Sequence, residues 1–185
     1  MATFYDSISP DLQEWIEAQH IFFVASAPLS ADGHINLSPK GLDCFRVLGP
    51  NRVVYLDLTG SGNETSAHLA ENGRITFMFC SFAKAPRIAR LFGRGETILP
   101  GSDEWDSLRS RFPADYAGVR QIIAADIYQA QTSCGYAVPF MQFVEERDTL
   151  LRSSAAKGEA GMTQYRIEKN SVSLDGLPAP LAEKR

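Results

Sequence analysis

The chain has 185 residues, the size of one ordinary domain, and its 18 Lys and Arg against 22 Asp and Glu give a net charge of −4 at pH 7. This acidic balance excludes a polybasic nucleic-acid clamp and provides no field that would draw the protein onto an anionic membrane. With 44% apolar and 22% charged residues, the composition is that of a globular domain that folds around its own core.

Targeting and metal signals are both missing from the sequence. No apolar run approaches the roughly twenty residues of a membrane helix, and the N-terminus has no basic segment followed by an apolar stretch. We therefore expect a cytoplasmic protein that binds neither membrane nor nucleic acid. Cys44, Cys80 and Cys134 lie far apart, which fits neither a disulfide framework nor a zinc site, and the three histidines are scattered. Reduced thiols and no metal site are predicted.

The predicted elements begin with a helix over about 10–20, which Ser9 caps and Pro10 opens. Six or seven short strands follow along the chain, at 21–27, 34–40, 44–48, 52–58, 74–82, 88–99 and 121–131. Further helices are expected at about 62–72 and from Ser102 to Arg111. Because most connections have hairpin length, the sheet should be antiparallel and closed or sandwiched rather than doubly wound.

The C-terminal part has a different pattern. Residues 145–170 look helical or irregular, with a flexible break at Lys157–Gly161, and the tail from Asp175 is rich in turn residues. No repeat or linker divides the chain. We expect one domain over 1–185, with a barrel core at about 20–145 and a helical or irregular extension over 146–185.

Polar and apolar side chains alternate completely along the predicted strand 34–40. Ile35, Leu37 and Pro39 point one way, and the opposite face carries His34, Asn36, Ser38 and Lys40. This polar face is either a solvent-facing strand surface or the wall of a ligand site. Pro39 removes a donor from the ladder and so indicates an edge or irregular strand end that a ligand can approach.

A glycine-rich turn, Leu58–Ser66, joins a predicted strand to a predicted helix. Ser61 and Glu64 form a Ser-x-x-Glu capping box, so helix capping alone explains the motif. The same geometry exposes backbone N–H groups at the positive end of a helix dipole, which suits a phosphate. The spacing of Gly60, Gly62 and Thr65 lacks the third glycine and the βαβ context of a dinucleotide-binding turn, which we reject.

Two later segments hold further candidates. Arg94 lies on one face of the strand 88–99, where an arginine can bind a phosphate or join an Arg–Glu ladder on the sheet or at a dimer contact. In the segment 131–140, Cys134 is a candidate nucleophile, but no histidine and acid accompany it, and a buried structural cysteine is the alternative.

As a set, these motifs resemble the pyridoxamine 5'-phosphate oxidase-like, FMN-binding split-barrel proteins. The resemblance covers about residues 10–145 and rests on the segments 36–41, 57–65, 68–73, 75–79 and 87–95. The segment Thr132–Tyr136 followed by Val138-Pro139 is similar to a branch other than the true pyridoxamine phosphate oxidases. The resemblance implies a mainly β, six-stranded antiparallel split β-barrel with flanking helices, and a homodimer with FMN between its subunits.

The resemblance also implies which residues bind the cofactor. The FMN phosphate and ribityl chain would be held by residues of the polar strand and the helix start: Asn36, Ser38, Lys40, Thr59, Ser61, Gly62, Asn63 and Thr65. True oxidases carry Ser-Arg-Lys where this chain has Asn63-Glu64-Thr65, so Lys40 or Arg94 would have to compensate. Cys134 and Tyr136 are the best candidates for contact with the flavin ring or substrate. The C-terminal Arg-x-His segment of the true oxidases is absent, which argues against vitamin B6 oxidation.

The sequence thus favours a dimeric FMN-dependent oxidoreductase that transfers hydride between the flavin and a small-molecule substrate, with no catalytic residue assigned. A non-enzymatic flavin or small-ligand binding protein, such as a carrier or stress-related sensor, is the first alternative. An F420-dependent reductase is the second, although its acidic cofactor tail would call for more basic residues than the two motifs contain.

Overall fold

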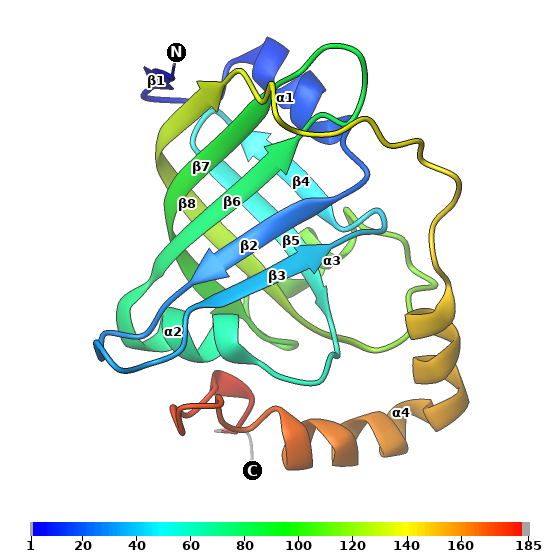
Figure 1. Ribbon diagram of the computed structural model, residues 1–185. Helices are drawn as coiled ribbons and strands as arrows, with labels where there is room; N and C mark the ends of the chain where they lie inside the picture. The colour runs from blue at the N-terminus through cyan, green and yellow to red at the C-terminus, as the bar shows by residue number, and fades with distance from the viewer. Residues whose placement is uncertain (1, 183–185) are drawn as a thin grey trace.

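One curled antiparallel sheet forms the body of the protein, as the computed structural model of residues 2–182 shows (Figure 1). Its strands are β1 (Thr3–Tyr5), β2 (Phe22–Ser26), β3 (Asn36–Lys40), β4 (Phe45–Gly49), β5 (Arg52–Leu58), β6 (Arg74–Cys80), β7 (Ile88–Ile98) and β8 (Val119–Ser133). They lie in the order β3-β2-β6-β7-β8-β5-β4, with β1 paired to β8. Because β3 and β4 are consecutive in the chain, the short connection 41–44 brings the two edges of the sheet together.

The predicted fold class is confirmed, and the strand number is corrected. The sheet has eight strands among residues 2–182, not six. The seven strand ranges expected along the chain are all present, as β2 to β8, and the additional strand is β1, which pairs with residues 130–132 of β8. The three residues of β1 are all exposed, so no hydrophobic pattern marks this strand in the sequence.

The α-helices lie near the predicted places: α1 (Pro10–Glu17), α2 (Glu64–Asn72), α3 (Trp105–Arg109) and α4 (Thr149–Lys169). The short 3-10 turn η1 (Pro180–Ala182) was not predicted. The predicted cap of α1 is confirmed, because Ser9 Oγ accepts a hydrogen bond from the Leu12 N–H at 3.2 Å. Leu12 and Ile16 are buried on the face of α1 that meets the core. Burying each such side chain stabilises the fold by about 1.5–3 kcal/mol.

Two apolar clusters lie on the two faces of the curled sheet. The inner cluster is rich in aromatic rings, with Phe22, Tyr55 and Phe77 almost fully buried and in edge contacts. The outer cluster gathers Leu56 and Ile122 under α3 and its flanking loops. Since β5 and β8 contribute to both clusters, their side chains are buried on both faces, as the continuous apolar runs in the sequence indicate.

Beyond β8 the chain leaves the barrel. Residues 134–148, here called the strap, contain no helix or strand and cross from one end of the barrel toward the other before α4 begins (Figure 1). The predicted break in the last helix is found at Gly158, which has φ 67° and ψ 170°. The tail returns to the barrel, where Asp175 accepts hydrogen bonds from the backbone N–H and ring of His34. We call α4 and residues 170–182 the C-terminal segment.

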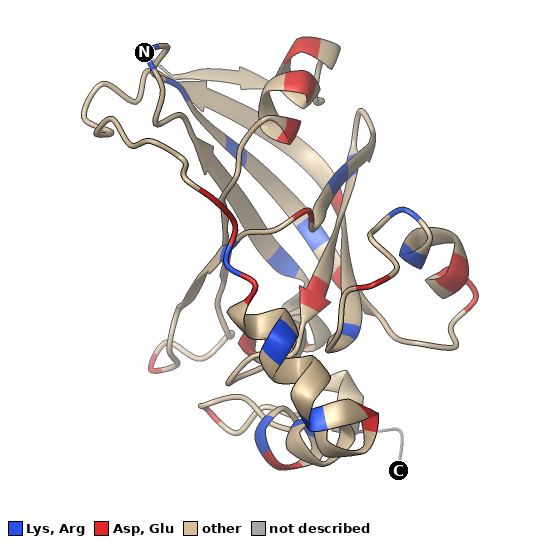
Figure 2. Ribbon diagram, turned by 90° about the vertical axis from the view of Figure 1, so that its right-hand side faces the viewer, with Lys and Arg blue, Asp and Glu red and all other residues tan. Residues whose placement is uncertain are grey.

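The charged residues are spread over many elements (Figure 2). Acidic residues follow one another along α1, and acidic and basic residues alternate where the strap enters α4. No helix within residues 2–182 combines the length and the apolar character needed to cross a membrane. In the same part of the chain, no group of three or more His, Cys, Asp or Glu residues is placed to hold a metal ion.

Candidate functional site

The polar face of β3 points inward. Asn36, Ser38 and Lys40 are half-buried, whereas Ile35 and Leu37 are 78% and 63% exposed. For Asn36, Ser38 and Lys40 the interpretation as a solvent-facing surface is therefore wrong, whereas His34, just before β3, is exposed. An edge strand with this inverted pattern has polar partners inside the barrel and an uncovered apolar face outside it.

Two cations meet one buried carboxylate beneath this strand. Lys40 Nζ lies 2.9 Å from Asp57 Oδ1, and Arg120 Nε lies 2.8 Å from Asp57 Oδ2. The Gln121 amide also donates to Oδ2 at 2.7 Å. Asp57 and Arg120 are nearly inaccessible, with 2% and 5% of their side chains exposed. With two positive charges and one negative charge, the group has a net charge of +1. We call these four residues the Asp57 cluster.

The pKa of Asp57 follows from this arrangement. Burial raises the pKa of the carboxyl group, but the charges of Arg120 and Lys40 and their hydrogen bonds more than offset burial, so the pKa lies below its ordinary value. The carboxylate is therefore ionised at neutral pH and holds both cations in place.

Gly118 and the first residues of β8 hold the turn 59–63 in place by hydrogen bonds. The backbone N–H and the hydroxyl of Thr59 both donate to the Gly118 carbonyl at 2.8 Å. Arg120 donates to the Gly62 carbonyl at 2.7 Å, and the Gln121 amide reaches Asn63 Oδ1 at 2.8 Å. The Asp57 cluster and the turn are thus one hydrogen-bonded unit, which brings together the predicted residues Lys40, Thr59, Gly62 and Asn63.

The predicted capping box at α2 is wrong. Asn63 is the N-cap residue, without a side-chain capping bond, and Ser61 is exposed two residues earlier. The Glu64 carboxylate accepts a hydrogen bond from the Leu174 backbone N–H at 3.0 Å. In a capping box, the Glu64 carboxylate would accept from a backbone N–H of the turn. Here it accepts from a backbone N–H of the C-terminal segment instead.

A second polar group joins β3 to α2. The Asn36 amide donates to Thr65 Oγ1 at 3.0 Å and to Ser26 Oγ at 3.3 Å, and Ser38 donates to Asn36 Oδ1 at 2.9 Å. Ser26 also bonds His68 Nδ1 at 3.0 Å. Burial lowers the pKa of His68, which favours the neutral ring. The structure therefore unites Asn36, Ser38 and Thr65, and adds Ser26 and His68, which the sequence did not suggest.

The remaining predicted residues lie elsewhere. Arg94 donates to the Asn72 carbonyl at the far end of α2, at 2.7 Å. Cys134 follows Ser133, which pairs with Ile88 at the opposite end of β7. Cys134 and Tyr136 are both exposed, so the alternative of a buried structural cysteine is wrong for Cys134. The structure does not bring these three residues to the Asp57 cluster.

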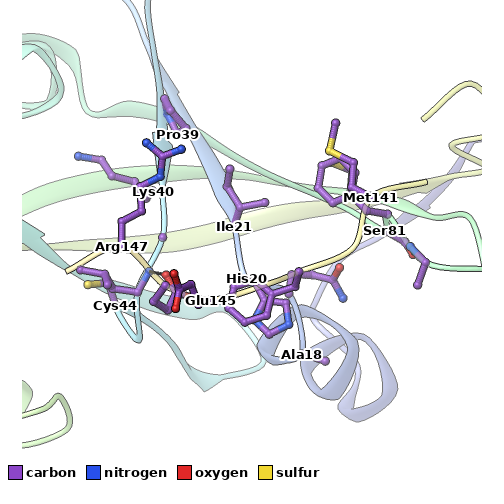
Figure 3. Close-up of a pocket in the computed structure, with 18 of the residues that line it drawn as sticks. Ala18, His20, Ile21, Pro39, Lys40, Cys44, Ser81, Met141, Glu145 and Arg147 are labelled. Atoms are coloured by element: carbon purple, nitrogen blue, oxygen red, sulfur yellow. Dashed lines mark hydrogen bonds between the residues drawn. The ribbon is translucent and has the colours of Figure 1, made fainter. Parts of the chain in front are cut away.

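A cavity of about 1010 Å³ opens beside the Asp57 cluster, between the ends of β3 and β5 and the strap. Lys40 and Gly60 line it, together with mainly apolar residues that include Leu42, Leu56 and Leu58, and the strap adds the charged residues Glu145, Glu146 and Arg147. Figure 3 shows Lys40 and Arg147 on one side of this space and Met141 and Ser81 on the other. Such a volume with few polar groups is typical of a site for a small organic ligand or cofactor.

Aromatic stacking ties the strap to the cavity wall. The rings of His20 and Phe143 are 3.7 Å apart and nearly parallel, at 6°. The Glu146 carboxylate accepts from the Leu42 N–H at 3.2 Å, where Leu42 has the unusual φ of 63°. Cys44 also lines the cavity, but burial, and next the charge of Asp57, raise the pKa of its thiol to about 12, so it is no nucleophile at neutral pH.

Comparison with known proteins assigns the chain to a family. The sequence pattern described as pyridoxamine 5'-phosphate oxidase matches residues 8–134. The chain belongs to the pyridoxamine 5'-phosphate oxidase family. The pyridoxamine 5'-phosphate oxidase family protein ustO of Aspergillus flavus is 40% identical over 201 residues, an alignment that covers 96% of this chain and 78% of that protein.

Solved structures of similar proteins support the fold. HupZ from Group A Streptococcus aligns with a TM-score of 0.53 and 18% identity, over 68% of this chain and 99% of HupZ. A Lactobacillus delbrueckii protein named after pyridoxamine 5'-phosphate oxidase gives the same TM-score at 13% identity, over 68% of this chain and 94% of its own. The C-terminal segment of this family member lies beyond the matched residues 8–134.

Three members of the Asp57 cluster had only weak signals in the sequence. Asp57 is one acid in the apolar run of β5, and Arg120 and Gln121 are a polar pair just before the apolar residues of β8. A polar residue inside an apolar strand needs hydrogen-bond or charge partners, so the position of these three residues in apolar strands is the signal that marks them. Their pairing with Lys40 depends on the closure of the barrel in this family member.

Proposed function

We propose that this protein binds FMN and acts as a flavin-dependent oxidoreductase on a small molecule. The observation that carries the proposal is the excess positive charge of the Asp57 cluster at the wall of a large apolar cavity. FMN has the same two-part chemistry, with an anionic phosphate at one end and a flat, largely apolar ring at the other. Membership in the pyridoxamine 5'-phosphate oxidase family supports the same cofactor class.

The residues present fit such a cofactor at the phosphate end. Lys40 is 25% exposed and lines the cavity, so its ammonium group can meet an anion while it stays bonded to Asp57. A Cβ placed on Gly60 would meet no atom within 4 Å, which leaves open space beside the turn. Backbone N–H groups at the start of α2 add favourable dipoles for an anion.

The apolar part of the cavity fits the flavin ring. Leu42, Leu56 and Leu58 line the wall beyond Lys40 and would keep water from the ring. When bound, the flavin supplies the electron and hydride transfer, and the protein binds and orients it. No side chain of the cavity is assigned as a proton donor or acceptor in this proposal.

A visible spectrum and a titration test the cofactor assignment. The purified protein is expected to bind FMN with about micromolar or tighter affinity, and FAD and F420 more weakly, because Lys40 and the turn 59–63 suit one compact phosphate. Failure to bind any flavin would contradict the proposal. Anaerobic reduction of the bound flavin by NADH or NADPH then separates an oxidoreductase from a flavin carrier.

The proposal includes a homodimer. β3 is an edge strand whose outer face exposes Leu37, Ile35 just before it is also exposed, and the strap exposes Phe140 and Val144. Exposed apolar groups of this kind favour the association of two chains, because association removes the apolar surface from water. Light scattering should give twice the chain mass for the wild type, and Leu37→Lys should shift the protein toward the monomer. A monomeric wild type at high concentration would contradict the dimer.

A further inference from the structure

Arg166, on α4, reaches the turn 59–63 from outside the barrel. Its Nε donates to Thr59 Oγ1 at 3.0 Å, and Nη2 donates to the Val119 carbonyl at 3.1 Å. Only 15% of the Arg166 side chain is exposed. Figure 1 shows α4 crossing below the end of the barrel where α2 lies. A residue from the last helix thus lies against the start of the candidate phosphate-binding turn.

The charge of Arg166 is available to a ligand. Its ion-pair partner, Glu159, is 79% exposed and lies 3.0 Å from Nη1, so water and salt screen that pair strongly. A guanidinium group stays protonated and has five N–H donors, of which the three hydrogen bonds use three. Two donors therefore make no hydrogen bond to the described residues, and Arg166 lies behind the turn whose Gly60 lines the cavity.

Asn170 ties the same segment to the same turn. Its amide donates to the Gly60 carbonyl at 3.1 Å, and its backbone carbonyl accepts from Asn63 Nδ2 at 3.2 Å. Its Oδ1 is buried and accepts no hydrogen bond from the described residues. An unpartnered buried oxygen is costly, and a ligand hydroxyl or an ordered water beside the turn would remove that cost.

We infer that the C-terminal segment completes the flavin site, with Arg166 as a cofactor-binding residue for the phosphate. Arg166 supplies the cation that Glu64 and Thr65 cannot provide at the start of α2. This inference rests on the proposed function. It assigns a binding role to a residue outside the segment 8–134 that matches the family.

Paired titrations with FMN and riboflavin test the inference, because riboflavin has the same ring and ribityl chain but no phosphate. Arg166→Gln is expected to weaken FMN binding about 10- to 100-fold, as for loss of one charged hydrogen bond, and riboflavin binding by less than about twofold. The matched control is Arg152→Gln, in the same helix, where Arg152 is 73% exposed and pairs with Asp148. This control should leave both affinities unchanged.

Two outcomes would overturn the assignment. An equal loss of FMN and riboflavin affinity would show that Arg166 only supports the turn, and unchanged FMN affinity would exclude any role at the site. If Arg166→Gln does not fold, Arg166→Lys, which keeps the charge, should retain most of the FMN preference over riboflavin. Loss of that preference would contradict the inference. A wild type that binds neither flavin would contradict the proposed function itself, before any variant is compared.

Discussion

Replacing Asp57 with asparagine is expected to lower the free energy of unfolding by about 3–5 kcal/mol, the largest effect of any single change at the site. The variant leaves Arg120 buried and Lys40 half-buried without a counter-ion, while the new amide retains little attraction for either. Urea denaturation measures the change. Asp126→Asn is the matched control: Asp126 pairs with Arg52 but is 71% exposed, so its loss should cost less than about 1 kcal/mol.

The pH dependence of the same measurement identifies the ionised carboxylate as the cause. In the unfolded chain Asp57 titrates near 3.8, and in the folded protein its pKa is lower. Its contribution to stability is therefore complete above about 3.8 and is lost as the pH falls below that value toward the folded pKa. Asp57→Asn should lack this acid-linked loss. An Asp57→Asn protein as stable as the wild type would show that the cluster contributes no net stabilisation.

Much of the fold could be predicted because local patterns determine it. The cap at Ser9 and the apolar strand 74–80 (β6) each depend on residues within one element and its immediate neighbours. The inward orientation of β3 could not be predicted in the same way. Asn36 and Lys40 turn inward because Thr65 and Asp57, from other elements, accept their hydrogen bonds, and only the closed barrel brings those partners near.

The candidate site was predicted in part for a similar reason. The segments 36–40 and 59–65 were found from their polar pattern and their glycines, and the structure joins them in two polar groups. The partners from the C-terminal segment were missed, because Arg166, Asn170 and Leu174 are more than a hundred residues from the atoms of Thr59, Gly60 and Glu64 that they bind. Glu64 is an example: the local sequence predicted that it caps α2 with Ser61, but its hydrogen-bond partner is the distant Leu174.

Lys40 links the stability of the cluster to its proposed function. Since Arg120 and Gln121 remain on Asp57 when Lys40 is removed, the carboxylate stays ionised and hydrogen-bonded. Removal of Lys40 should therefore lower the free energy of unfolding by less than Asp57→Asn does, by about 1–2 kcal/mol. The excess positive charge, in contrast, disappears completely, because one cation then balances one carboxylate.

Lys40→Met is accordingly expected to weaken FMN binding by about 1.5–3 kcal/mol, roughly 10- to 100-fold, with little effect on riboflavin. Methionine keeps much of the apolar stem, so the wall of the cavity retains its shape. Fluorescence titration measures both affinities, and Lys84→Met, at an exposed lysine, is the control. Equal FMN affinity in the wild type and Lys40→Met would remove Lys40 from the phosphate site. An equal loss for both flavins would mean that Lys40 shapes the cavity rather than binding the phosphate.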